Sequence, residues 1–323
     1  MKSTAPIGGA ENSPQSVKRV ALVGIGGIAR KVYLPLLSGH PRAEIVGVVS
    51  RSESSVREAA ARYRIPNAST ELGDLLRWEP DAVFVHSATA AHYEIVTKCL
   101  EAGLPVYADK PLSTDPGESA AMAAKAEKKG LLLAAGFNRR FAPLYVEAKA
   151  WIEEAGGFAQ VHAAKHRTSP QNASARDTVY DDLIHMLDLL LWLSGGDSRL
   201  LSNTLDTDRE RRMLGAFGAL RLGGAAGSYA MTRSAGRDSE RLELHGSGRT
   251  AVVDDLERAV FTAAGGRPEE RGFGGWDTVL KRRGFEGVVE HFLDCLDDPQ
   301  RCTVRADLVL GSHELAERAA RSF

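Results

Sequence analysis

The chain has 323 residues, which is enough for two domains that each bury a core of their own. Its 41 basic residues nearly balance its 42 acidic residues, giving a formal net charge of −1. No overall field therefore favours nucleic acid or an anionic membrane, and a small-molecule substrate is the better expectation.

Residues 1–16 are predicted to form a flexible tail. They lack the apolar core of a signal peptide. No later apolar run reaches the length of a membrane span. The cysteines show no C-x-x-C spacing, which argues against a disulfide framework or a structural zinc site: Cys99, Cys295 and Cys302. We therefore expect a cytoplasmic protein with reduced thiols and no metal.

A glycine-rich turn follows the first predicted strand. Val20–Val23 is an apolar run typical of a strand covered on both faces, and the next six residues fit the pattern G-x-G-x-x-G/A. In dinucleotide-binding folds these positions allow a tight turn, a close approach of backbone to pyrophosphate, and close helix–strand packing. A helix over residues 28–38, bent near Pro35, would direct its amino end toward the phosphates. The expected cofactor contacts here are Gly24, Gly26, Gly27, Ile28 and Ala29.

The second predicted strand, Ala43–Val49, ends in Ser50-Arg51-Ser52 and not in an acid. A carboxylate at this position binds the adenosine ribose of NAD, whereas an arginine accommodates the 2′-phosphate of NADP. Arg51 can pair with that phosphate, and Ser50 or Ser52 can donate to it. The sequence therefore favours NADP(H). Arg51 could also be a solvated loop cation, and the nearby Glu53 keeps NAD(H) possible.

Strands and helices continue to alternate up to Gly136. We expect helices over 54–63, 72–78, 115–129 and one capped by Thr89 that ends near Gly103, with strands over 81–85, 105–107 and 131–135. This order predicts an α/β fold whose first domain, residues 17–136, is a doubly wound parallel sheet. Loops at the carboxyl ends of its strands should line the cofactor crevice. They supply further candidates: Ser87, Ala88, Thr89, His92, Asp109 and Lys110.

The second half, residues 137–323, is predicted to be a substrate-binding and oligomerisation domain. Helices are expected over 143–154, 287–296 and 305–321, a strand over 158–165, a polar loop over 171–177, and a loop over 265–275. Between residues 200 and 253, several short strand-like stretches are broken by glycines. They predict an antiparallel sheet with one face packed on helices and the other open to a partner, as in a homodimer or homotetramer.

Residues 178–194 read as a very apolar helix that Gly195-Gly196 stops. On helical spacing Asp181, His185, Asp188 and Trp192 share a stripe, and such a stripe is most economically placed against a cavity. Two other interpretations remain open. The aspartates could complement the helix amino terminus while His185 is a core residue, or an Asp/His pair could bind a metal, although no third ligand is spaced to join them.

The glycine turn, the tripeptide Asp109-Lys110-Pro111 and the Asp181-x-x-x-His185 helix, in this order, resemble the Gfo/Idh/MocA family of nicotinamide-dependent oxidoreductases. Three segments (VFVHSATAAH, GFNRRFAPLY and DDLIHMLDLLLWLSGG) are most similar to its MviM branch. The resemblance covers nearly the whole chain after the tail. It implies a Rossmann domain followed by an α/β domain with a large, mostly antiparallel sheet. Family members often carry Glu-Lys-Pro where this chain has Asp109-Lys110-Pro111.

The resemblance also implies a catalytic set of Lys110, Asp181 and His185. His185 would exchange a proton with a substrate hydroxyl or carbonyl, Asp181 would orient the imidazole, and Lys110 would hold the substrate oxygen during hydride transfer. Weaker candidates for the substrate pocket are Arg140, His166 and Arg167. Two alternatives stay open: a non-catalytic dinucleotide-binding regulatory protein, and an imine or enone reductase on the same scaffold.

Overall fold

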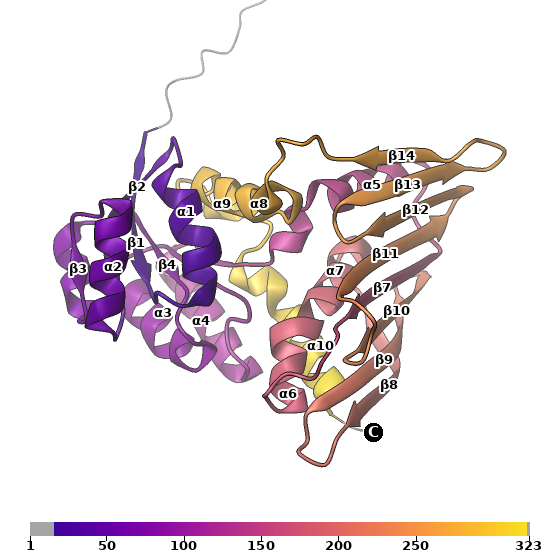
Figure 1. Cartoon of the computed structure of the whole chain (residues 1–323), viewed down its shortest axis with the longest axis horizontal. Coiled ribbons are helices and arrows are strands. Elements are labelled where there is room, and N and C mark those ends of the chain that lie inside the picture. Colours follow the sequence, from indigo (N-terminus) through magenta and orange to yellow (C-terminus); the bar gives the residue numbers. More distant parts are fainter. Residues whose placement is uncertain (1–15, 322–323) are drawn as a thin grey trace, which may run out of the picture.

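Two domains lie side by side in the computed structural model, which describes residues 16–321 (Figure 1). All of the expected tail except Ser16 lies outside the described residues. One domain carries a six-stranded sheet and the other an eight-stranded sheet. Within residues 16–321, every helix is too short or too polar to cross a membrane.

The first domain is the predicted doubly wound parallel sheet. Its strands lie in the order β3-β2-β1-β4-β5-β6, so the order reverses between β1 and β4. In such sheets a ligand binds in the crevice outside the carboxyl ends of the strands at this reversal. The bounds are β1 Lys18–Val23, β2 Ala43–Val49, β3 Ala68–Ser69, β4 Ala82–Val85, β5 Val106–Ala108 and β6 Leu133–Ala135.

The helices of this domain mostly follow the expected positions: α1 Leu34–Ser38, α2 Glu53–Tyr63, α3 His92–Glu101 and α4 Pro116–Lys129. Pro35 lies in the first turn of α1, where its missing N–H costs little, and the preceding turn Ala29–Tyr33 is π-helical. The segment Leu72–Trp78 is a 3₁₀-helix. The expected cap by Thr89 is wrong, because Thr89–Ala91 forms a separate 3₁₀ turn without a side-chain cap.

The second domain carries the predicted large, mostly antiparallel sheet. Its order is β14-β13-β12-β11-β7-β10-β9-β8, and only the central pair β7 and β10 is parallel. The expected loop over 265–275 is wrong in part, because residues 269–272 pair with β13 and are held extended. The bounds are β7 Gln160–His166, β8 Arg199–Thr207, β9 Met213–Leu222, β10 Ala225–Thr232, β11 Ser239–Gly246, β12 Arg249–Asp254, β13 Arg258–Ala263 and β14 Glu269–Gly272.

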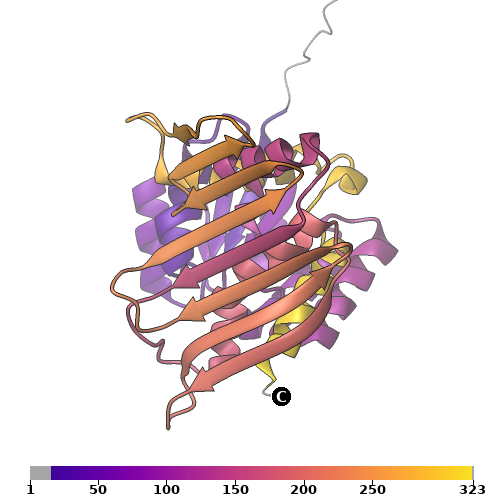
Figure 2. The same cartoon turned by 90° about the vertical axis from the view of Figure 1, so that its right-hand side faces the viewer.

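Helices cover only one face of this sheet, and Figure 2 shows the other face bare. The helices that follow the first domain in the chain are α5 Pro143–Glu154, α6 Ala175–Thr178, α7 Ile184–Ser194, α8 Val279–Arg282, α9 Phe285–Asp294 and α10 Leu310–Ala320, with 3₁₀ turns at Asn138–Phe141, Pro299–Arg301 and Ala306–Val309. The expected polar loop 171–177 already enters α6 at Ala175, because Ser174 caps this helix. Helix α9 returns to the first domain, where Phe292 packs edge-on against Phe84, with ring centroids 5.2 Å apart.

Candidate active site

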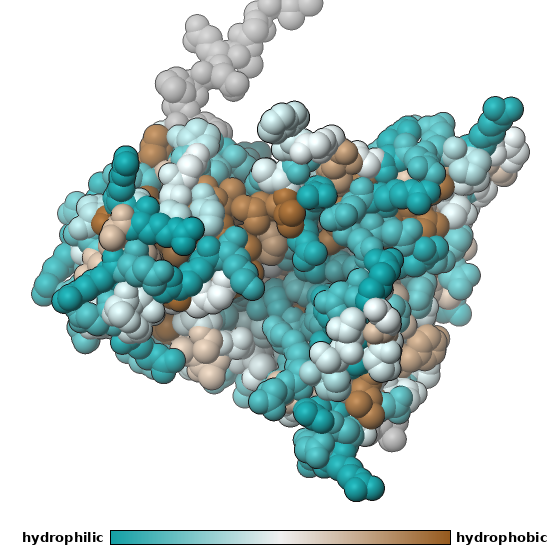
Figure 3. All heavy atoms as spheres, in the orientation of Figure 1, coloured by the Kyte–Doolittle hydropathy of each residue, from teal (hydrophilic) through white to brown (hydrophobic). Residues whose placement is uncertain are grey.

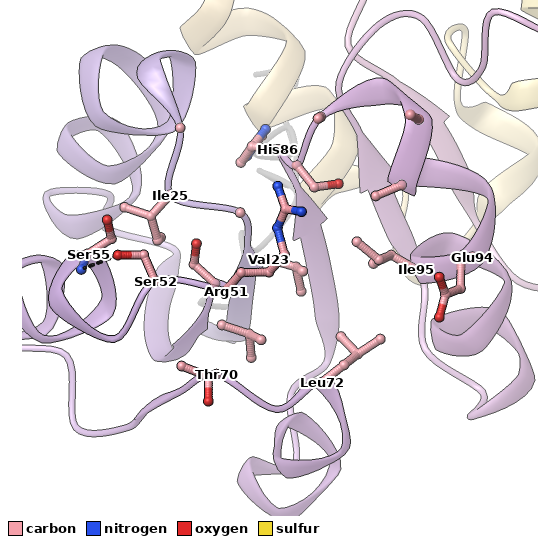
Figure 4. A pocket seen from close by; sticks show the side chains of 18 of the residues that line it. Val23, Ile25, Arg51, Ser52, Ser55, Thr70, Leu72, His86, Glu94 and Ile95 are labelled. Atoms are coloured by element: carbon pink, nitrogen blue, oxygen red, sulfur yellow. Dashed lines mark hydrogen bonds between the residues drawn. The ribbon is translucent and has the colours of Figure 1, made fainter.

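A cavity of about 900 Å³ opens at the reversal point of the parallel sheet (Figure 4). Seven of the predicted cofactor contacts line it: Gly24, Gly26, Ser50, Arg51, Ser52, Ser87 and Ala88. The wall also contains residues that the sequence did not single out, among them Ser55, Thr70, His86, Glu94, Ile95 and Lys98. Glu94, Ile95 and Lys98 lie in α3, and Thr70 follows β3, which with two residues is too short to leave a hydrophobic pattern.

At Gly24 the backbone of the glycine turn lies directly against the backbone of His86 and Ser87. Its φ of +95° lies in the region that favours glycine, and a Cβ there would stand 2.6 Å from the carbonyl carbon of His86. The hydroxyl of Ser87, on the cavity wall, is buried without a hydrogen-bond partner among residues 16–321. A tight glycine turn and an unsatisfied hydroxyl are what a bound dinucleotide phosphate would use, so the residues present fit such a cofactor.

Six predicted contacts do not line this cavity: Gly27, Ile28, Ala29, Thr89, Asp109 and Lys110. His92 lies outside it as well. It is buried, and its ring nitrogens lie 3.0 Å from the carbonyl oxygens of Pro111 and Ser87. His92 therefore ties together the two loops that border the crevice, and its role is structural.

Arg51 lies on the cavity wall at the amino end of α2 (Figure 4). The hydroxyl of Ser52 caps that helix by accepting a hydrogen bond from the Ser55 amide at 3.3 Å. Glu53, the acid that kept NAD possible, forms an ion pair with Arg57 at 2.6 Å. The cation and the helix amino end are thus both available to an anion in the cavity.

Two of the three predicted catalytic residues meet across the gap between the domains, and Figure 3 shows this face hollowed there. Lys110 follows β5, and its peptide bond to Pro111 is cis. Its ammonium donates to the main-chain oxygen of Asp181 and lies 3.4 Å from that residue's Oδ1. The other carboxylate oxygen of Asp181 accepts from Gln171 at 2.8 Å.

His185 is buried and bonds to a residue that the sequence analysis missed. Its Nδ1 lies 3.2 Å from Nη1 of Arg139, which stands in the 3₁₀ turn after the first domain. The expectation that Asp181 orients the imidazole is wrong in this structure. Residues 179–183 form a π-helix, so the 3.6-residue spacing that aligned Asp181 with His185 does not hold there.

A buried group of charges surrounds Asp182, the neighbour of Asp181. Lys165 donates to its carboxylate, Arg233 lies 2.8 Å away and Arg167 lies 3.3 Å away. Burial alone would raise the pKa of Asp182, but these cations lower it to about 2. Burial and the charge of Arg139 lower the pKa of Lys165 to about 7. The one signal for this group was Lys165, a charged residue at the end of the strand expected over 158–165.

Two of the weaker candidates do not face the substrate gap. Arg140 is buried, and its Nε and Nη2 donate to Asp188 at 2.9 and 2.6 Å. Arg140 and Asp188, a member of the predicted stripe, therefore stabilise the fold. His166 lies on the opposite face of β7 from the buried Lys165, because successive strand residues alternate faces. Of the three, Arg167 alone belongs to the charged group.

Two of the three cysteines lie close together. Cys295, Cys302 and His291 could offer ligand atoms within 4.8 Å of one another, which sequence spacing did not reveal. The Nε2 of His291, however, accepts a hydrogen bond from the Thr303 amide at 2.9 Å. The Nε2 lone pair that would bind a metal therefore already accepts a main-chain hydrogen bond.

Comparison with known proteins agrees with this geometry. A family model described as an oxidoreductase family with an NAD-binding Rossmann fold matches residues 18–137, and a YceM-like C-terminal domain matches residues 143–263. The protein YceM of Salmonella typhimurium is 36% identical over 87% of this chain and 90% of its own. The solved dehydrogenase MviM of Clostridium difficile is 29% identical, with a TM-score of 0.87 over 93% of this chain and 98% of its own. A UDP-N-acetylglucosamine 3-dehydrogenase of Acidithiobacillus ferrooxidans is 26% identical over 86% of this chain and 88% of its own.

Proposed function

Because this chain belongs to the Gfo/Idh/MocA family of NAD(P)-dependent oxidoreductases, we propose that it moves a hydride between NADP(H) and a sugar, polyol or related small molecule. The observation that carries the proposal is the contact of Lys110, from the cofactor domain, with Asp181, from the second domain, close to His185. The name of the Acidithiobacillus relative supports a carbohydrate substrate.

Cofactor binding and substrate chemistry would be carried out by different groups of residues. The glycine turn, Ser87 and Arg51 would hold the dinucleotide in the cavity at the carboxyl ends of the strands. When bound, the nicotinamide supplies or accepts the hydride. Lys110, Asp181 and His185 would surround the substrate oxygen, exchange its proton and stabilise the charge that develops on it. A cytoplasmic location is part of the proposal, supported by three free cysteines.

Substrate-dependent oxidation of NADPH tests this function. Purified protein is incubated with NADPH and a panel of keto-sugars, inososes and other carbonyl compounds, and nicotinamide fluorescence is followed over time. Turnover of a carbohydrate carbonyl supports the proposal. Tight NADPH binding without turnover of any compound would favour a dinucleotide-binding regulatory protein, and turnover of imines or enones alone would move the activity to that class.

Arg51→Ala is expected to weaken NADPH binding by about 10- to 100-fold and to leave NADH binding unchanged. The variant removes the guanidinium that would pair with the 2′-phosphate, and a charge-assisted contact of this kind contributes about 1.5–3 kcal/mol. Fluorescence titrations with both cofactors measure the effect. Arg62→Ala, at the far end of the same helix, is the matched control. An unchanged NADPH affinity would remove Arg51 from the cofactor site.

We also propose that the bare face of the large sheet binds a second copy of this chain, giving a homodimer or a larger homo-oligomer. Phe217 projects from that face with 51% of its surface exposed, which makes it the candidate contact for the second copy. Phe217→Arg is expected to convert the oligomer to a monomer in multi-angle light scattering. Leu308→Arg, exposed to 53% but away from the sheet, should leave the mass unchanged. A monomeric wild-type protein would refute the proposal.

A further inference from the structure

Arg139 determines which nitrogen of His185 carries the proton. A guanidinium has only donor groups, so the hydrogen bond at 3.2 Å requires Nδ1 of His185 to accept. A neutral imidazole has one donor and one acceptor nitrogen, and its proton must then be on Nε2. No residue between 16 and 321 bonds to Nε2, and this atom is not sealed from solvent.

Arg139 cannot turn away from this position. Its Nε and Nη2 donate to the two carboxylate oxygens of Glu240 at 2.7 and 2.8 Å, a bidentate pair that fixes the plane of the guanidinium. The hydroxyl of Tyr145 donates to the same carboxylate at 3.1 Å. Arg139 and Glu240 are both buried, so water does not compete for these contacts. The remaining N–H group of the fork is therefore held against His185.

The surroundings also oppose a second proton on the ring. Burial lowers the pKa of His185 well below its usual value, and the nearby positive charges lower it further: Arg139, Lys165, Lys110 and Arg167. Negative groups close to these cations, Asp181, Asp182 and Glu240, are each engaged with a cation. A histidine in this setting remains neutral through the physiological range and is a poor proton shuttle.

We propose that His185 keeps its Nε2 proton throughout the reaction and acts as a neutral hydrogen-bond donor to the substrate oxygen, while Lys110 carries the proton. Arg139 is then a positioning residue that maintains this tautomer. In reduction, a hydride with its electron pair reaches the carbonyl carbon, the C=O bond becomes a C–O single bond, and the ammonium of Lys110 gives its proton to that oxygen. Lys110 is left as an amine and is recharged by solvent beside the exposed Asp181. This inference rests on the proposed function.

The tautomer can be observed without substrate. Protein labelled with ¹⁵N-histidine has nine histidines, and loss of one signal set in His185→Gln assigns the ring of interest. Long-range ¹H–¹⁵N spectra distinguish the two neutral tautomers from the cation. We expect a neutral ring protonated on Nε2 from about pH 5 to about pH 9, whereas an ordinary histidine gains its second proton within this range. A proton on Nδ1, or titration between about pH 6 and about pH 7, would overturn the inference.

Arg139→Lys tests the positioning role, because lysine keeps the charge toward Glu240 but lacks the rigid fork. We expect loss of the single tautomer, a fall in kcat of roughly 10²-fold with little change in KM, and a new acidic limb in the pH–rate profile. Arg140→Lys, one residue further along and paired with Asp188, should preserve the His185 spectrum. An unchanged tautomer in Arg139→Lys would refute the positioning role.

These results separate the inference from the proposed function. An active wild-type enzyme with the wrong tautomer would refute the role of His185 alone. A protein that binds NADPH but turns over no substrate would refute the proposed function, whatever its histidine spectrum shows. Retained NADPH binding in each variant shows that its first domain has folded.

Discussion

Lys110→Met is expected to lower kcat by roughly 10²- to 10⁴-fold, the range for loss of a proton-transfer group. Lys110 is the proposed proton carrier, its side chain is only 12% exposed, and its ammonium bridges to Asp181 in the other domain. Methionine has a similar length and keeps the apolar stem packed, so the change removes mainly the charge and the proton. Single-turnover oxidation of bound NADPH measures the chemical step directly.

The affinity for NADPH should change little in this variant, because Lys110 does not line the dinucleotide cavity. Lys125→Met is the matched control: this lysine pairs with Glu101 on the surface of the first domain, and its loss should leave kcat unchanged. Full activity of Lys110→Met would contradict the proton-carrier role and return that role to His185 or to the buried Lys165.

The cofactor half of the site could be predicted from the sequence because its signals are local. Gly24 follows β1 directly and opens the glycine-rich turn, and Arg51 lies two residues after β2. Alternation of strands and helices then places Ser87 and Lys110 at the same edge of the sheet. These relations depend on neighbours within one strand–helix unit, and hydrophobic periodicity reports them well.

The substrate half could not be predicted to the same depth, because its contacts join distant parts of the chain. Arg139 and Glu240 are 101 residues apart, and their pairing depends on where β11 lies beside β7. Asp181 lies at the gap within a π-helical turn, and its carboxylate contacts Lys110 and Gln171 instead of His185. Regular helical spacing of 3.6 residues per turn also predicted that Asp188 faces the cavity, whereas its carboxylate is buried against Arg140.

Asp188→Leu is expected to lower the Tm by roughly 6–20 °C, because it leaves the Arg140 guanidinium buried without its partner. Asp188 is 1% exposed and accepts from Arg140 and from the hydroxyl of Ser312. Breaking a buried pair on one side costs about 3–5 kcal/mol, and each kcal/mol corresponds to about 2–4 °C in domains of this size. Differential scanning calorimetry of the NADPH-free protein measures the shift.

The double variant Arg140→Met with Asp188→Leu should recover most of that loss, since replacing both buried charges with apolar groups of similar volume is close to neutral. Recovery would show that the pair acts through desolvation and packing, as expected for residues that join helix α7 to the turn at Asn138–Phe141 and to Thr303, whose carbonyl Arg140 also binds. If instead the double variant kept its Tm but lost substrate affinity, Arg140 would belong to the substrate pocket after all. The rescue therefore decides between a structural arginine and a binding one, which a single substitution could not do.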